Sequence, residues 1–173
     1  MTHGPIALRV NGAEDRYILV EFQAHNTDFA VNRRLWTFSL PFVAFDPFWY
    51  SHTQTQVDVT RSDGGTFTVS NAGNARVFPD VTFIGQSGGT VQPRLTFPAG
   101  GFAIHYIGTL SSGQQLVMSI RRQTATIGGT GQLNNLASGF FLYPRLDPGN
   151  NTLTVNTDSG SLRVQMSYRS RWY

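Results

Sequence analysis

Apolar and polar residues alternate strictly in the final segment of the chain. Four apolar residues share one face of this pattern: Leu162, Val164, Met166 and Tyr168. Four polar residues share the other face: Arg163, Gln165, Ser167 and Arg169. A period of two places successive side chains on opposite faces of a β-strand. The pattern therefore predicts a strand at residues 162–169 with one buried face.

Other strand-like runs recur along the chain, separated by turn sequences at a spacing of roughly 8–12 residues. The turns are rich in Gly, Pro, Asn and Asp: SDGG (62–65), NAGNA (71–75), GQSGG (85–89), PAGG (98–101), SSG (111–113), GGTG (128–131), DPGNN (147–151) and DSG (158–160). The runs are RYILVEFQA (16–24), FTVS (67–70), DVTFIG (80–85), RLTF (94–97), FAIHYIGTL (102–110), QLVMSIRRQTATIG (115–128), FFLYP (140–144), TLTVNT (152–157) and LRVQMSYRSRW (162–172). Without a sustained helical period, this predicts an all-β chain, an antiparallel β-sandwich or jelly roll.

Aromatic rings concentrate in the segment PFVAFDPFWYS, residues 41–51. In the strand-like run that leads into it, four apolar residues alternate with mostly polar ones and are expected to face inward: Trp36, Phe38, Leu40 and Phe42. Downstream lies the polar run HTQTQ (52–56). A domain boundary is therefore expected directly after the aromatic segment. The rings themselves admit three interpretations: a stacking platform, a pocket, or the end of one folding unit.

Composition narrows the classes of function. Charged residues make up 13% of the chain, against roughly 25% in an ordinary globular domain. A weakly charged polar surface suits packing between subunits, since interface cores are depleted of charge. The net charge is +3, and every basic residue is Arg. Because these arginines are scattered, we expect no nucleic-acid partner.

No catalytic or metal-binding pattern is present. The chain has no Cys, and its four histidines, at positions 3, 25, 52 and 105, lack local metal-ligand spacing. Eight of the ten carboxylates are Asp, mostly in turn sequences, and no serine elbow or phosphate-binding loop occurs. We therefore expect no enzyme, no cofactor and no metal. No signal segment or membrane-length apolar run is apparent, which predicts synthesis in the cytoplasm and no membrane insertion.

Two aromatic residues are candidates for stacking on a carbohydrate: Tyr106 and Trp172. Sugar-binding β-sandwiches place rings against the apolar face of a pyranose, and these two rings are expected to be exposed. The competing interpretation is that the aromatic residues pack in the core.

Four segments together resemble siphophage distal tail proteins and their minor-tail-protein relatives. They are RRLWTFSLPFVAFDPFWYS (33–51), NAGNARVFPDVTFIG (71–85), FFLYPRLDPGNNTLTV (140–155) and VQMSYRSRWY (164–173). They occur in the order typical of that family and span most of the chain from about Trp36. The third segment departs from the pattern by an insertion, Arg145–Asp147. At SSGQQLVMSI (111–120), Gln115 and Ser119 stand where the family carries acids.

The resemblance implies a structural virion protein at the tail tip. It implies a homo-oligomeric ring, commonly six-fold, that joins the tail tube protein to the hub or baseplate proteins. It also implies that Asp46, Pro47, Trp49 and Tyr50 form a joint. An N-terminal β segment with a short hairpin (1–51) would precede it, and a galectin-like C-terminal sandwich (52–173) would follow.

Relatives usually have a longer N-terminal domain, so here that domain would be reduced or completed by another chain. The resemblance also places the protein in the virion after synthesis in the host cytoplasm. The alternative functions are a module that binds host cell-surface glycan and a capsid decoration protein.

Overall fold

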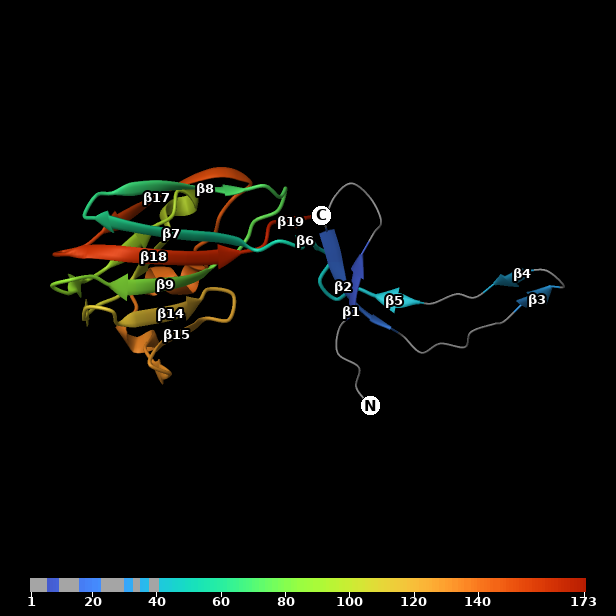
Figure 1. Cartoon of the computed structure of the whole chain (residues 1–173), viewed down its shortest axis with the longest axis horizontal. Coiled ribbons are helices and arrows are strands. Elements are labelled where there is room, and N and C mark those ends of the chain that lie inside the picture. Colours follow the sequence, from blue (N-terminus) through green and yellow to red (C-terminus); the bar gives the residue numbers. More distant parts are fainter. Residues whose placement is uncertain (1–5, 10–15, 23–29, 33–34, 38–40) are drawn as a thin grey trace. The chain divides into compact units, whose positions relative to one another are not determined.

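The computed structural model of the chain describes residues 6–9, 16–22, 30–32, 35–37 and 41–173. The chain divides into two compact units (Figure 1). One comprises Met1–His52 with Trp172–Tyr173, and the other Thr53–Arg171. The first crossing lies within one residue of the boundary expected after Ser51. The return of the last two residues to the first unit means that the larger unit is inserted within the smaller one.

The smaller unit is built from short strands. A sheet of order β1-β2-β6-β19 contains most of them, with β5 pairing to β2, while β3 and β4 pair with each other. The strands are β1 (Ile6–Arg9), β2 (Arg16–Phe22), β3 (Ala30–Asn32), β4 (Leu35–Thr37), β5 (Phe42–Val43), β6 (Trp49–Ser51) and β19 (Arg171–Trp172). β1 and β2 form the short antiparallel hairpin expected at the start of the chain. The Trp36 side chain and residues 38–40, expected to face inward, lie outside the described part of the structure.

The larger unit is a β-sandwich, as predicted. One sheet has six antiparallel strands in the order β16-β15-β14-β9-β18-β7, and the other has four in the order β12-β11-β17-β8. Figure 1 shows β7, β18, β9, β14 and β15 side by side. The six-stranded sheet contains β7 (Thr55–Ser62), β9 (Asp80–Gly85), β14 (Gln115–Ser119), β15 (Thr124–Ile127), β16 (Thr130–Gly131) and β18 (Ser161–Tyr168). The four-stranded sheet contains β8 (Thr66–Asn71), β11 (Arg94–Thr96), β12 (Ala103–His105) and β17 (Gly149–Asn156).

One hydrophobic core fills the space between the two sheets. Its members come from alternate positions of both, for example Phe83 of β9, Val164 of β18 and Leu153 of β17, all fully buried. In β18, Leu162, Val164, Met166 and Tyr168 all point into this core, as the alternation predicts. Burying apolar side chains from both sheets is the main force that holds such a sandwich together.

A two-stranded ladder and three 3₁₀ helices complete the sandwich. β10 (Thr90–Val91) pairs with β13 (Thr109–Leu110), and the 3₁₀ helices are η1 (Ala99–Gly101), η2 (Leu133–Asn135) and η3 (Ser138–Leu142). None of the helical segments in the described residues is long and apolar enough to span a membrane.

The structure corrects three of the expected strands. FFLYP lies in η3 and its C-terminal end, anchored by the buried Phe140, and the helix ends at Tyr143 in the left-handed region. QLVMSIRRQTATIG is a hairpin, β14–β15, whose turn ends at Gln123 with a φ of 53°. The Gln123 side chain stabilises that turn through a 2.8 Å hydrogen bond to the Ile120 carbonyl. FAIHYIGTL is split into β12 and β13.

Candidate functional site: the base of the sandwich and the N-terminal hairpin

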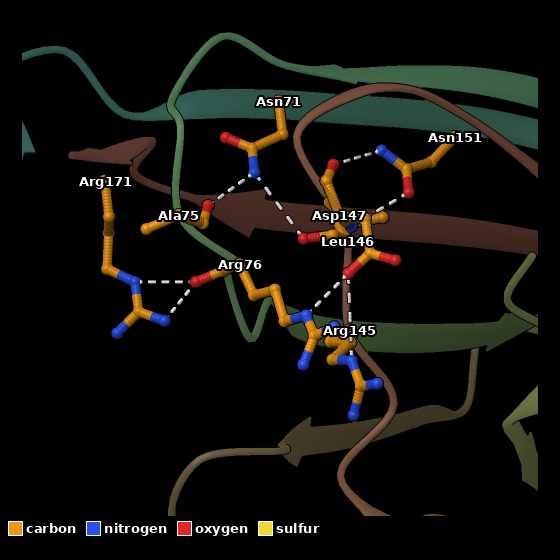
Figure 2. A network of polar contacts seen from close by, with 8 residues as sticks. All are labelled: Asn71, Ala75, Arg76, Arg145, Leu146, Asp147, Asn151 and Arg171. Carbon is orange, nitrogen blue, oxygen red and sulfur yellow. Dashed lines mark hydrogen bonds and ion pairs between the residues drawn. The ribbon is translucent and has the colours of Figure 1, made fainter. Parts of the chain in front are cut away.

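Two buried asparagines organise the loops at one end of the sandwich (Figure 2). Asn71 ends β8 and is 1% exposed. Its side-chain amide donates to the Ala75 carbonyl at 2.9 Å, and its side-chain oxygen accepts from the Gly73 backbone N–H at 3.1 Å. The Asn71 side chain thus gives a hydrogen-bond partner to one backbone carbonyl and one backbone N–H of the tight loop after β8. This stabilises the loop, because a buried backbone group without a partner is destabilising.

Asn151 does the same for the turn that leads into β17. Its side-chain amide donates to the carbonyls of Asp147 and Gly149, at 2.8 and 3.0 Å, and its oxygen accepts from the Asp147 N–H at 3.0 Å. Gly149 has a φ of 88°, which favours glycine after Pro148. The sequence DPGNN is therefore a turn closed by its own last residue.

The two loops are joined to each other through backbone pairing. Val77 and Leu146 exchange hydrogen bonds at 3.0 and 2.9 Å, and the Asn71 amide lies 3.5 Å from the Leu146 carbonyl. On the exposed side, the Asp147 carboxylate forms an ion pair with Arg76 at 3.0 Å. Two segments more than sixty residues apart in the sequence thus form one rigid base.

The chain leaves the sandwich across this base at Arg171. Its carbonyl accepts from the Ala75 N–H at 3.1 Å, and its guanidinium Nε donates to the Arg76 carbonyl at 2.8 Å. Gly73 lies directly against the Arg171 backbone: a Cβ at Gly73 would overlap the Arg171 carbonyl oxygen and lie 2.7 Å from its nitrogen. Figure 2 shows the Arg171 guanidinium pointing toward the Arg76 carbonyl oxygen. The base therefore fixes the point at which the chain departs for the smaller unit.

The predicted joint residues lie in the smaller unit. The Tyr50 hydroxyl donates to the Asp46 carboxylate at 2.5 Å, and the Tyr50 ring stacks on Tyr17 at a centroid distance of 5.8 Å. Tyr50 is buried and Trp49 is half-buried, whereas Pro47 is exposed. Tyr50 and Trp49 belong to β6, the last strand before the chain enters the sandwich. Asp46 and Tyr50 thus brace the segment just before this crossing.

The two stacking candidates belong to different units, Tyr106 to the sandwich and Trp172 to the smaller unit. Tyr106 is 7% exposed and belongs to the core, because it points inward with Ile104 while His105 between them points outward. Its ring is therefore not available to a ligand. Trp172 is half-buried, and the Arg16 guanidinium covers one face of its ring, 3.7 Å from the centroid.

The N-terminal hairpin presents an apolar face that sequence reasoning missed. The β1–β2 register places four apolar side chains on one face: Ile6, Leu8, Ile18 and Val20. Phe22 and Phe42 continue this face and meet edge to face at 5.8 Å. We call these six residues the hairpin face. Alternation of period two in IALR (6–9) was the available signal, but a strand of four residues is too short to stand out.

Most of the hairpin face is incompletely buried. Ile6 is 46% exposed, Leu8 39%, Phe22 44% and Phe42 38%, so Phe42 does not face a closed core as predicted. Val20 and Tyr50 are the only buried hydrophobic residues of this unit within the described part of the chain. Large exposed apolar patches of this kind mark interaction sites, and β1 is also an edge strand of its sheet.

The described residues contain no cluster of His, Asp or Glu able to hold a metal ion. The strongest polar pair on the six-stranded sheet is structural: Arg163 forms two hydrogen bonds with Asp58, at 2.8 and 2.6 Å. These bonds, together with one from Gln165, lower the pKa of Asp58 to about 2. The Asp58 carboxylate therefore stays ionised and pairs with Arg163.

Comparisons with known proteins relate this geometry to one family. The model of the family described as "Siphovirus-type tail component, C-terminal domain" matches residues 72–172, more than half of the chain. That stretch includes Gly73, Asn151 and Arg171 of the base. No curated protein matches the chain.

Among the solved structures with a similar fold is that of the SPP1 Dit protein (gp 19.1), described as a paradigm of the hub adsorption apparatus in phages that infect Gram-positive bacteria. The TM-score is 0.71 at 12% sequence identity, with 98% of this chain and 66% of that chain covered. At this identity the likeness concerns the fold. This chain therefore spans about two thirds of the length of that protein.

Proposed function

Because the chain belongs to the siphovirus-type tail component family, we propose that it forms a homo-oligomeric ring at the tail tip, joining the tail tube to the hub or baseplate. Membership of the family makes it a structural component of a phage tail. We propose in addition that it lies at the tail tip, that it forms a ring, and that it contacts the tail tube and the hub or baseplate. The observation that carries it is the hairpin face, which the smaller unit leaves half-exposed.

The energetics favour a partner on this face. Fully burying a large apolar side chain contributes about 1.5–3 kcal/mol, so covering the remaining two fifths contributes about 1 kcal/mol for each residue. Ile6, Leu8, Phe22 and Phe42 would together contribute about 4 kcal/mol to each contact. In a closed ring, each copy contacts one neighbour through its own hairpin face and the other neighbour through the surface that receives that copy's hairpin face. No hairpin face and no β1 edge then remains exposed.

The two units would then have different roles. The smaller unit forms the ring, with strands of a neighbouring copy or of the tail tube protein completing its sheet. The sandwich is carried as a preformed body, because it has its own core and its base holds the end of the insertion at Arg171. The role is structural rather than catalytic, and the site of action is the virion after synthesis in the host cytoplasm.

The test is a comparison of native masses by mass photometry. The wild-type chain is expected to form a discrete oligomer of the 19.1 kDa protomer, six copies if the ring is six-fold. The variant Ile6→Ser/Leu8→Ser should be monomeric, because it removes two residues of the hairpin face. Ile107→Ser, which changes an even more exposed apolar residue of the sandwich, should assemble normally. Assembly of the double variant at wild-type concentrations would refute the assignment of the interface.

A further inference from the structure

Two adjoining cavities lie over the outer face of the four-stranded sheet. One has a volume of about 310 Å³ and the other about 240 Å³, and Arg94 and His105 line both. We call the combined depression the Arg94 groove. All of its residues belong to the sandwich, so it is separate from the hairpin face and does not depend on the ring proposed above.

Three polar side chains cross the floor of the groove in one row. Arg94 of β11 is in register with His105 of β12 on one side and with Asn156 of β17 on the other. All three alternate with buried neighbours and so point away from the core. Adjacent strands are about 4.8 Å apart, so the guanidinium, the imidazole and the carboxamide can contact neighbouring groups of one ligand.

Arg94 lacks the carboxylate partner that some other arginines of the sandwich have. Arg163 is paired with Asp58, and Arg76 with Asp147. Within the described residues, the Arg94 side chain makes no hydrogen bond or ion pair. A guanidinium presents several N–H donors in a planar fork, which matches a phosphate or carboxylate group.

The two cavities differ in charge. The larger one contains no carboxylate: Phe102 and Leu142 give it an apolar wall, and Gly100 and Gly101 leave backbone exposed. The smaller one contains Asp63 and Asp158. Asp63 already accepts the Thr157 N–H at 3.0 Å and the Asn156 amide at 3.3 Å. An anionic group therefore fits at Arg94 and His105 on the side of the larger cavity, while the carboxylates and amides of the smaller one suit hydroxyl groups.

We propose that the Arg94 groove binds an anionic, hydroxyl-rich ligand, a sugar or polyol that carries a phosphate or carboxylate group. The anion contacts Arg94 and His105. The hydroxyl groups reach Asn156 and the acceptors of the smaller cavity, and the carbon skeleton lies against Phe102 and Leu142. The combined volume, within the range of small-molecule sites, accommodates one or two sugar units.

The test uses ligand-observed saturation-transfer NMR, which tolerates a large oligomer, with two anionic probes and their uncharged counterparts. Glycerol 3-phosphate is compared with glycerol, and glucuronate with glucose. Both anionic probes, or one of them, should bind at millimolar concentration, and the stronger one identifies the preferred anion. The uncharged counterparts should bind at least about tenfold more weakly, because one charge-assisted hydrogen bond contributes that much.

Variants assign the site. Arg94→Gln should weaken binding of the anionic probe by about tenfold or more. Arg122→Gln, an equal change of charge in the β14–β15 turn, should leave it unchanged. His105→Gln should also weaken binding of the anionic probe, but by less. This variant replaces Arg94→Gln as the test if Arg94→Gln lowers the melting temperature. The proposal is overturned if neither anionic probe binds, if the uncharged probes bind equally well, or if both groove variants bind like wild type.

Discussion

The substitution Gly73→Ala tests how the base of the sandwich holds the departing chain. A methyl group at this position would overlap the Arg171 carbonyl oxygen and approach the Arg171 nitrogen and carbonyl carbon to 2.7 and 2.9 Å. All three atoms belong to the backbone, so no side-chain rotation relieves the overlap. The segment at Arg171 must move away from the loop after β8.

The expected cost can be worked out from these contacts. Overpacking of this kind costs about 1–3 kcal/mol. Moving Arg171 also weakens the hydrogen bond from the Ala75 N–H to the Arg171 carbonyl, which contributes about 1 kcal/mol. Replacing glycine with alanine restricts the unfolded chain and returns about 0.4–1 kcal/mol. The net destabilisation is about 1–3.5 kcal/mol, or a melting temperature lower by about 2–14 °C.

The assay is urea unfolding followed by fluorescence, with hydrogen exchange at the Ala75 amide as a local measurement. Gly131→Ala is the matched control, because a Cβ there meets no atom within 4 Å. We expect Gly73→Ala to be the less stable of the two variants and its Ala75 amide to exchange faster. If the two variants unfold within 0.5 kcal/mol of each other, a difference that a surface substitution can produce, the close approach at Gly73 does not exist.

Three further substitutions test the network and the ion pair. Asn151→Ala should cost about 1–3 kcal/mol, because it leaves the partly buried backbone groups of Asp147 and Gly149 without their side-chain partner. The exposed neighbour Asn150→Ala should have little effect on chemical denaturation. Gly149→Val should lower the melting temperature through a cost of about 1–2 kcal/mol from its φ of 88°, since the site is otherwise open; an unchanged melting temperature would contradict the turn assignment. Asp58 has a pKa lowered from 3.8 to about 2, chiefly by its hydrogen bond with Arg163, so its stabilising effect is present above about pH 4 and is lost as the pH falls toward 2. Asp58→Asn should therefore flatten the melting temperature between pH 4 and 2, and curves parallel to wild type would argue against the pair.

Among the strands that sequence analysis located, β8 and β18 show a strict alternation of buried and less buried residues. β18 is the best example, because each of its apolar residues reaches the core. β7 was not located, since Val57 and Val59 are its only apolar residues and both are only partly buried. The β14–β15 turn lacks Gly, Pro and Asn, so a glutamine side chain stabilises the left-handed residue that a glycine would normally supply.

The candidate site was predictable in part. Asn71, Gly73 and Asn151 lie within the segments that carry the family resemblance. Their role in joining the two loops of the base could not be predicted, because it depends on contacts between residues far apart in the sequence. The stacking proposal for Tyr106 failed because FAIHYIGTL gives no sign of which face points inward. Likewise, neither Arg94 nor His105 is unusual in its local sequence. Only the pairing of β11 with β12 and β17 places them beside Asn156.

The most direct test of assembly through the smaller unit is hydrogen exchange in β2. It is measured first on the dilute, monomeric chain and then on the assembled oligomer. If neighbouring copies or tail proteins complete the smaller unit, protection of the Leu19–Phe22 amides should rise sharply with assembly, while protection in β18 stays constant. If the β2 amides of a monomeric chain are already as protected as those of β18, the smaller unit is complete by itself. The interface proposed here would then be wrong.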